Sequence, residues 1–193
     1  GYKYANSVID EETGRALEYR HLIQDPKYKN IWNEAGCKEF GGLFQGYGKN
    51  ADGTKIVEGT DTCHWIRKHL IPAKKKVTYA RTVVDIRPEK DDPNRVRITA
   101  GGDRLDYYGE TSTETASLET AKILINSVLS TKNAKFMAID ISNFYIQTDL
   151  PDYQYMRFHK SMIPSNIIDE YKLTTVMDDD GWCYAEIRKC IYG

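Results

Sequence analysis

Asp140 is the residue whose surroundings most favour chemistry in this sequence. It stands in an apolar run, with Met137, Ala138 and Ile139 before it and Ile141 after it. A carboxylate is costly to bury in such a run unless something compensates its charge. A carboxylate fixed at the end of a rigid strand is also what a divalent metal ion requires. On this run alone Asp140 is either a metal ligand or a structural acid that pairs with an arginine or caps a turn.

A second candidate is a group of arginines in a basic segment. Residues 64–104 contain 11 Lys and Arg against 5 Asp and Glu, although the whole chain has a net charge of −1. Such a segment is a candidate surface for phosphate-bearing partners, and a solvated face is the alternative. Arginine can donate two parallel hydrogen bonds to a phosphate, which favours Arg81, Arg95 and Arg97 over the run Lys74-Lys75-Lys76 as specific contacts. The lysines are then solvated or touch a nucleic-acid backbone nonspecifically.

A β-hairpin is expected to position these arginines. Small or apolar residues alternate with polar ones from Val77 to Arg87, and again from Arg95 to Ala100, as is typical of half-buried strands. The segment Asp91-Asp92-Pro93-Asn94 between them predicts a turn. Alternation puts Arg95 and Arg97 on one face of their strand, and Arg81 can join them from the partner strand.

The remaining pattern predicts a mixed α+β fold. We expect helices from Asp25-Pro26 through Leu43, from Ser117 to about Ser130, and from Ser165 to Lys172. We expect strands at Phe136–Ile141, Met156–Phe158 and Trp182–Ile187, a loop at 46–62, a turn at Pro151–Tyr155, and a hairpin tip at Asp178-Asp179-Asp180-Gly181.

Composition excludes some classes of protein. No apolar run approaches the roughly 18 residues that span a bilayer, and no signal peptide is visible, so we expect no membrane partner. The four cysteines are scattered without a CxxC pair, which favours reduced thiols of an intracellular protein over a zinc site.

Several ordered segments resemble the copia-type retrotransposon reverse transcriptases. The segment Asp140-Ile141-Ser142-Asn143-Phe144-Tyr145 is similar to the family's motif A, D-V-x-x-A-F, with an aromatic five residues after the acid. Arg95 to Gly102 stands where the family has K-x-R-L-V-A-x-G, and Asp106 to Thr111 is similar to D-Y-x-E-T with one extra glycine. Cys183 to Gly193 resembles C-x-L-x-x-S-L-Y-G, and Trp32 and Glu39 suit the helix that opens the family's domain.

The resemblance implies the fingers and early palm of a right-hand RNA-directed DNA polymerase. Asp140 and the backbone carbonyl of Ile141 would bind two Mg²⁺ ions for phosphoryl transfer, and Tyr145 would pack under the sugar of the incoming deoxynucleoside triphosphate. The basic hairpin would fold over that nucleotide and an RNA or DNA template-primer, with Arg97 as the first choice for the phosphates. Residues 1–62 would be the lead-in and first helix, 63–104 the fingers hairpin, and 105–193 the fingers-palm segment with motif A.

The catalytic set is expected to be incomplete in this chain. Such polymerases need a second motif, aromatic-x-Asp-Asp, and Met177-Asp178-Asp179 imitates it only 38 residues after Asp140. In the family the L-Y-G segment precedes the paired acids, so we interpret Asp178-Asp179-Asp180 as a turn. The true pair would lie beyond Gly193, with the rest of the polymerase and RNase H polyprotein, in a cytoplasmic particle or the nucleus. The alternatives are a non-catalytic nucleic-acid-binding or interaction module derived from such an element, and an unrelated α+β domain.

Overall fold

The computed structural model describes residues 7–105, 116–139, 141 and 144–192 of the chain. They belong to two compact units, the first formed by residues up to Leu105 and from Tyr145 onward, the second lying between Asp106 and Phe144. The first unit combines a mixed sheet with short helices, so the expected α+β class is confirmed.

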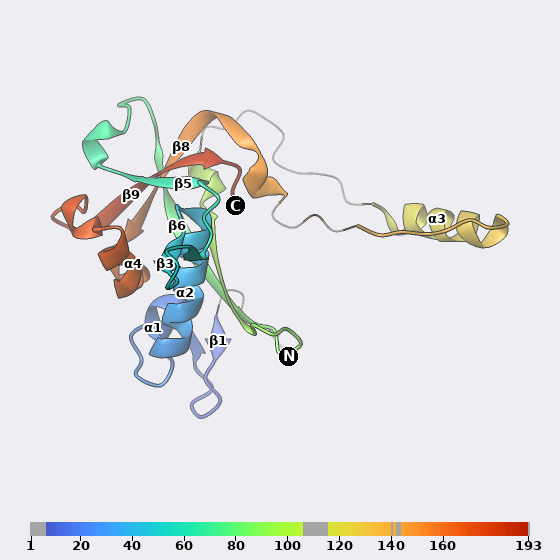
Figure 1. Ribbon diagram of the computed structural model, residues 1–193, viewed down its shortest axis with the longest axis horizontal. Coiled ribbons are helices and arrows are strands. Elements are labelled where there is room, and N and C mark those ends of the chain that lie inside the picture. The colour runs from blue at the N-terminus through green and yellow to red at the C-terminus, as the bar shows by residue number, and fades with distance from the viewer. Residues whose placement is uncertain (1–6, 106–115, 140, 142–143, 193) are drawn as a thin grey trace. The chain divides into compact units, whose positions relative to one another are not determined.

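A five-stranded sheet forms the centre of the first unit (Figure 1). Its strands lie in the order β5 (Cys63–Ile66), β9 (Trp182–Lys189), β8 (Asp149–His159), β6 (Val77–Ile86) and β7 (Asn94–Ala100). Every neighbouring pair is antiparallel except β8 and β6, which run parallel. Strand β7 is therefore one edge of the sheet, and its outer N–H groups need partners from elsewhere.

The basic hairpin predicted from the sequence is confirmed as β6 and β7. Its register pairs Arg81 with Thr99, Val83 with Arg97 and Asp85 with Arg95. The opposite face is buried and carries Thr78, Ala80, Thr82, Val84, Val96, Ile98 and Ala100. The alternation in the sequence placed the first four of these on one face. Ile86, expected on the same face, is 46% exposed because it lies next to the turn.

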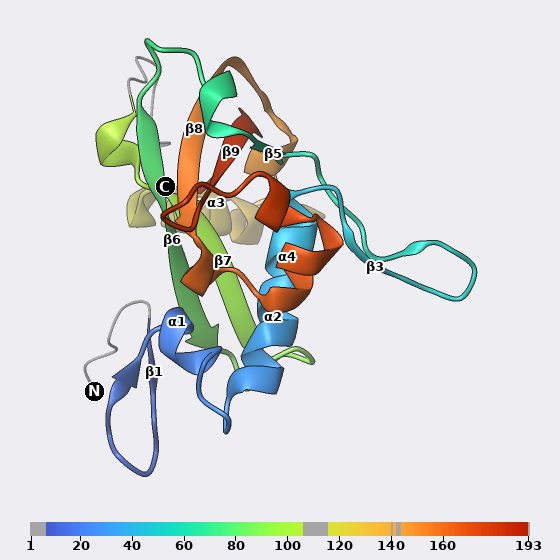
Figure 2. The same ribbon diagram turned by 90° about the vertical axis from the view of Figure 1, so that its left-hand side faces the viewer.

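Helix α2 (Lys29–Leu43) covers the core beside β7 (Figure 2). Its apolar side chains follow the helical spacing seen in the sequence, and Trp32 packs with Val84 and Val96 of the hairpin. An aromatic cluster fills the space further along the helix: Phe44 stacks on Trp65 with ring centroids 4.2 Å apart, and Phe158 meets Trp65 edge-on at 5.3 Å. The helix begins at Lys29 rather than at Pro26, because Asp25 caps a turn by accepting a bond from the Lys27 N–H at 2.8 Å.

Short elements complete the first unit. They are β1 (Val8–Ile9) paired with β2 (Ala16–Leu17), β3 (Tyr47–Lys49) paired with β4 (Lys55–Val57), helices α1 (Tyr19–Leu22) and α4 (Ser165–Glu170), and the 3-10 turns η1 (Lys68–Leu70), η2 (Gly102–Arg104), η3 (Tyr145–Gln147), η4 (Lys160–Met162) and η5 (Leu173–Thr175). The helix expected at Ser165 is confirmed, and it ends two residues early. The loop expected at 46–62 was wrong in part, because it contains the β3–β4 hairpin, which positive φ at Gly46, Gly48 and Gly53 permits.

Strand β8 corrects a second prediction. The turn expected at Pro151–Tyr155 was wrong, because the strand runs unbroken from Asp149 to His159. Its register with β9 shifts between Asp149 and Gln154. Such an irregularity accommodates a proline, which has no N–H to give to the ladder.

The second unit contains helix α3 (Leu118–Ser130), which the sequence predicted. Ser117 caps it by accepting a hydrogen bond from the Thr120 N–H at 3.2 Å. The strand predicted at Phe136–Ile141 was wrong for residues 136–139 and 141, which have no regular structure. A strand needs a neighbouring strand for its backbone groups, and the described part of this unit provides only a helix. Phe136 and Ile139 are consequently exposed.

Candidate functional site

The hairpin brings together Arg81, Arg95 and Arg97, the three arginines singled out in the sequence. Directly paired residues of an antiparallel ladder share a face. The pairs Arg81–Thr99, Val83–Arg97 and Asp85–Arg95 therefore put all three arginines on the side of the hairpin away from its buried face. We call Arg81, Arg95 and Arg97 the arginine face.

Arg97 lies at the centre of this face and is held by an aromatic ring. Its guanidinium carbon is 4.3 Å from the ring centroid of Tyr192. The Tyr192 carbonyl in turn accepts a hydrogen bond from the Ala100 N–H at 2.9 Å, which fixes Tyr192 to the edge of β7. The ring attracts the charge of the guanidinium, whose N–H groups can also donate to phosphate oxygens.

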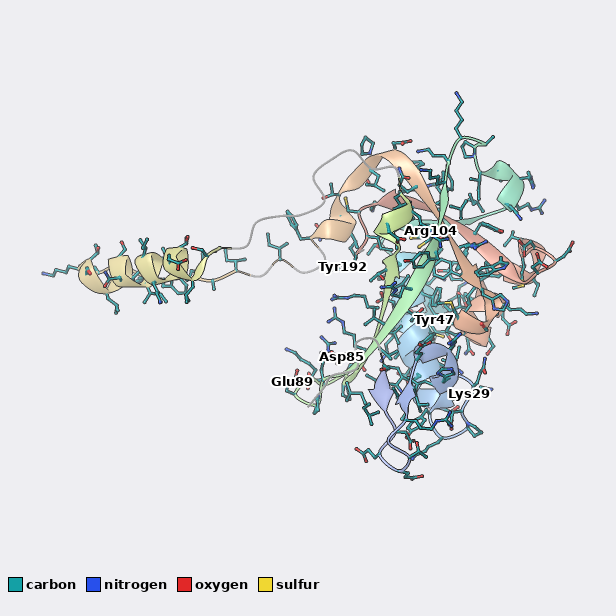
Figure 3. All side chains as sticks on the ribbon, turned by 180° about the vertical axis from the view of Figure 1, so that it is seen from behind. Lys29, Tyr47, Asp85, Glu89, Arg104 and Tyr192 are labelled. Atoms are coloured by element: carbon teal, nitrogen blue, oxygen red, sulfur yellow. The ribbon has the colours of Figure 1, made fainter. Side chains whose placement is uncertain are left out.

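Arg81 shares a second aromatic contact with Arg104. The guanidinium carbons of Arg81 and Arg104 lie 5.7 and 5.1 Å from the ring centroid of Tyr79. The Tyr79 hydroxyl donates to the Asp103 carboxylate at 2.9 Å, which holds the ring in place. Figure 3 shows Arg104 and Tyr192 at the end of the hairpin away from its turn, and Asp85 and Glu89 toward the turn.

Arg95 has a different environment from Arg97. It lies directly opposite Asp85 in the ladder, toward the turn of the hairpin. Opposite charges that face each other across a ladder compensate one another. We therefore rank Arg97 and Arg81 above Arg95 as groups that can meet an external anion.

A cleft of about 530 Å³ opens beside Arg81. It lies between β6 and the N-terminal elements, and its charged lining consists of Arg20, Arg81 and Glu18. Glu18 and Arg20 form an ion pair at 3.0 Å. Arg81 thus contributes its charge both to the arginine face and to the rim of this cleft.

The edge of β7 is closed by a carboxylate from α2. Glu39 accepts a hydrogen bond from the Ile98 N–H through Oε1 at 2.8 Å. Burial raises the pKa of this carboxyl to about 7, against the opposing effects of the Ile98 N–H and the charge of Arg97. The sequence placed Glu39 on a helix but contained no signal for this bond.

The motif A residues lie in both units. Asp140 lies outside the described residues. Ile141, whose carbonyl was the second predicted ligand, belongs to the second unit and is 57% exposed. Tyr145 begins η3 in the first unit. The chain after Tyr145 is anchored, because Ile146 is buried and the Thr148 carbonyl accepts a hydrogen bond from the Cys190 N–H at 2.8 Å.

Asp178 forms a structural turn, as the sequence interpretation predicted. Its carboxylate accepts hydrogen bonds from the Trp182 N–H at 2.8 Å and the Tyr184 hydroxyl at 2.9 Å. Partial burial raises the pKa of Asp178, but these two bonds and the charge of Lys68 outweigh it, and the net pKa is lowered. Gly181 completes the turn with φ of +84°. These bonds give both oxygens of Asp178 a partner within the turn.

Among the residues that the structure describes, no group of three or more His, Cys, Asp or Glu side chains could hold a metal ion. None of the described helices is long and apolar enough to cross a membrane. No family model, no curated protein and no solved structure matches the chain.

Proposed function

We propose that this chain is the fingers and early-palm part of a copia-type RNA-directed DNA polymerase. In the whole enzyme it would bind a deoxynucleoside triphosphate and a template-primer for two-metal nucleotidyl transfer. The observation that carries the proposal is the arginine face, where Arg97 lies beside Arg81 on a hairpin whose other face is buried in the core. The order of the motifs from Arg95 to Gly193 supports it independently.

The chemistry of the arginine face suits a triphosphate. Arg81 and Arg97 are diagonal neighbours in the ladder. Such diagonal positions are roughly 7–8 Å apart. Two long arginine side chains that start from positions at this spacing can reach different phosphates of one triphosphate. Asp140 and the Ile141 carbonyl would supply oxygen ligands for Mg²⁺, the ion that neutralises phosphate charge in such reactions.

The proposal includes a limit on activity. Two magnesium ions held by one carboxylate and one carbonyl would bind weakly, so the isolated chain should extend a primer on an RNA template negligibly. Clear incorporation that Asp140→Asn abolishes would contradict the incomplete site.

Triphosphate binding separates this function from that of a non-catalytic nucleic-acid-binding module. We expect a fluorescent deoxynucleoside triphosphate to bind the chain more tightly with Mg²⁺ than with EDTA, and Asp140→Ala to remove the difference. Binding of single-stranded nucleic acid that is indifferent to Mg²⁺ and to Asp140, without triphosphate binding, would favour the module instead.

A further inference from the structure

The outer edge of β7 is closed at two points just after Arg97, at Ile98 and at Ala100. The N–H groups of Ile98 and Ala100 point to the same edge, since they are two residues apart on one strand. The Ile98 N–H donates to Glu39 Oε1 at 2.8 Å, and the Ala100 N–H donates to the Tyr192 carbonyl at 2.9 Å. Neither partner is a strand of the sheet, so this edge depends on one side chain and one carbonyl.

The Glu39 side chain is partly buried. It belongs to α2 and stands next to the fully buried Phe40. An acid in such a place is costly unless its oxygens are bonded. The cost is offset by the bond to Ile98 and by the charge of Arg97, which opposes the rise in the pKa of Glu39.

Glu39 and Tyr192, the two partners of this edge, act on Arg97 in different ways. Tyr192 touches the guanidinium itself, with the guanidinium carbon 4.3 Å from the ring centroid. Glu39 instead binds the backbone N–H of Ile98, the residue after Arg97. This bond fixes the position of β7 relative to α2. A local displacement of β7 at Ile98 would move Arg97 relative to the Tyr192 ring, which is held two residues further along the strand, at Ala100.

We propose that Glu39 is a positioning residue for Arg97: by binding the Ile98 N–H it holds β7 so that the guanidinium stacks on Tyr192 with its N–H edge turned to a triphosphate. Only the part of this role that concerns the triphosphate rests on the proposed function. The geometric part concerns Glu39, Ile98 and Arg97 alone.

Three variants test the geometric part by NMR of the intact chain. Glu39→Ala removes the acceptor, whereas Glu39→Gln keeps an oxygen at the same place. We expect the Arg97 side-chain protons to show an upfield ring-current shift from Tyr192 that Tyr192→Leu removes. Glu39→Ala should reduce this shift and accelerate hydrogen exchange at Ile98, while Glu39→Gln should preserve both. An unchanged shift and unchanged Ile98 exchange in Glu39→Ala would overturn the proposal.

A double-mutant cycle tests the coupling to ligand. With a deoxynucleoside triphosphate and Mg²⁺ as the probe, Glu39→Ala should weaken binding roughly tenfold, and Glu39→Gln by less than about twofold. In an Arg97→Ala background, Glu39→Ala should have no further effect. Additive losses in the cycle would show that Glu39 acts elsewhere and would overturn its role in binding.

Failure of the proposed function has a separate signature. If the wild-type chain does not bind the triphosphate, the polymerase assignment fails, yet the ring-current and exchange measurements still decide whether Glu39 positions Arg97. If Glu39→Ala does not fold, Glu39→Asp replaces it, because the shorter side chain withdraws the acceptor from Ile98 while it keeps the charge. Unchanged Ile98 exchange and Arg97 shifts in Glu39→Asp would then overturn the proposal.

Discussion

The guanidinium carbon of Arg97 lies 4.3 Å from the centre of the Tyr192 ring. This cation–π contact joins two segments that are far apart in the sequence, and the guanidinium N–H groups can donate to another partner. A flat cation held on an aromatic face loses less freedom on binding a phosphate than a mobile side chain does. The contact therefore suggests where a triphosphate would meet the chain.

Arg97→Ala should weaken triphosphate binding by about ten- to a hundredfold, since a charge-assisted hydrogen bond contributes about 1.5–3 kcal/mol. Arg97→Lys should recover only part of the loss, because an ammonium cannot donate two parallel bonds. Fluorescence anisotropy with a labelled deoxynucleoside triphosphate measures both. Lys90→Ala, at the exposed turn of the hairpin, removes the same charge and is the control. If Arg97→Ala and Lys90→Ala weaken triphosphate binding equally, the binding depends on overall charge and not on the arginine face.

Adjacent glycines after β7 provide a second, matched test. A Cβ added at Gly101 would lie 2.6 Å from the Tyr79 ring and 2.9 Å from Thr78 Oγ1, whereas a Cβ at Gly102 would meet nothing within 4 Å. Gly101→Ala should therefore lower the free energy of unfolding by about 1–3 kcal/mol and displace Tyr79 from Arg81 and Arg104. Gly102→Ala should change it by less than about 0.5 kcal/mol. Urea denaturation of both variants decides the point, and similar losses would contradict the described packing.

The pKa of Glu39 predicts how stability depends on pH. The folded-state pKa is raised to about 7 from 4.5, mainly by burial. A raised carboxyl pKa means that the folded state holds the proton more tightly than the unfolded state does. The contribution of Glu39 to folding is thus most favourable below about pH 4.5, and it declines as pH rises to about 7, by about 3 kcal/mol in total.

Glu39→Gln isolates this contribution. The neutral side chain keeps an acceptor for Ile98 but does not titrate, so the difference in unfolding free energy between variant and wild type should grow in favour of the variant between pH 4.5 and 7. The charged group that acts on Glu39 is Arg97 from β7, and it remains in the variant. A difference that stays constant across this range would show that Glu39 titrates near its ordinary pKa.

The aromatic cluster should be the most sensitive part of the core. Phe158 is fully buried, 5.5 Å from Phe40 and 5.3 Å from Trp65 between ring centroids. Phe158→Ala should lower the free energy of unfolding by about 3–5 kcal/mol in urea denaturation. Ile56→Ala, at a side chain that is 61% exposed, should change it by less than about 0.5 kcal/mol. A loss below about 1 kcal/mol for Phe158→Ala would be incompatible with this cluster.

Local periodicity predicted much of the fold. The alternation through Thr78, Ala80, Thr82 and Val84 predicted the hairpin, and the helix expected from Ser117 to about Ser130 is α3. The same local reasoning failed at Pro151, where a register shift lets β8 continue through a proline. It also failed at 136–139, where apolar composition predicted a strand, but the described residues of that unit contain no neighbouring strand.

Only the part of the site that lies within the hairpin could be predicted from the sequence. Alternation placed Arg81, Arg95 and Arg97 on one face, because that face is determined within the hairpin. The contacts of Arg97 with Tyr192 and of Ile98 with Glu39 are tertiary, and Glu39 precedes Ile98 by 59 residues. No period in the sequence encodes such contacts, so Tyr192, Arg104 and the bond of Glu39 emerged only from the structure.

The central claim, that Asp140 is a magnesium ligand of a polymerase site, is tested most directly at its neighbour Ile141. Mn²⁺ can replace Mg²⁺ at an oxygen site, and it broadens the NMR signals of nearby amides even when it binds weakly. We predict that Mn²⁺ broadens the Ile141 amide, that excess Mg²⁺ restores it, and that Asp140→Ala abolishes the effect, while Asp178→Asn leaves it unchanged. An Ile141 amide that Mn²⁺ does not broaden, or broadens equally in Asp140→Ala, would contradict the account.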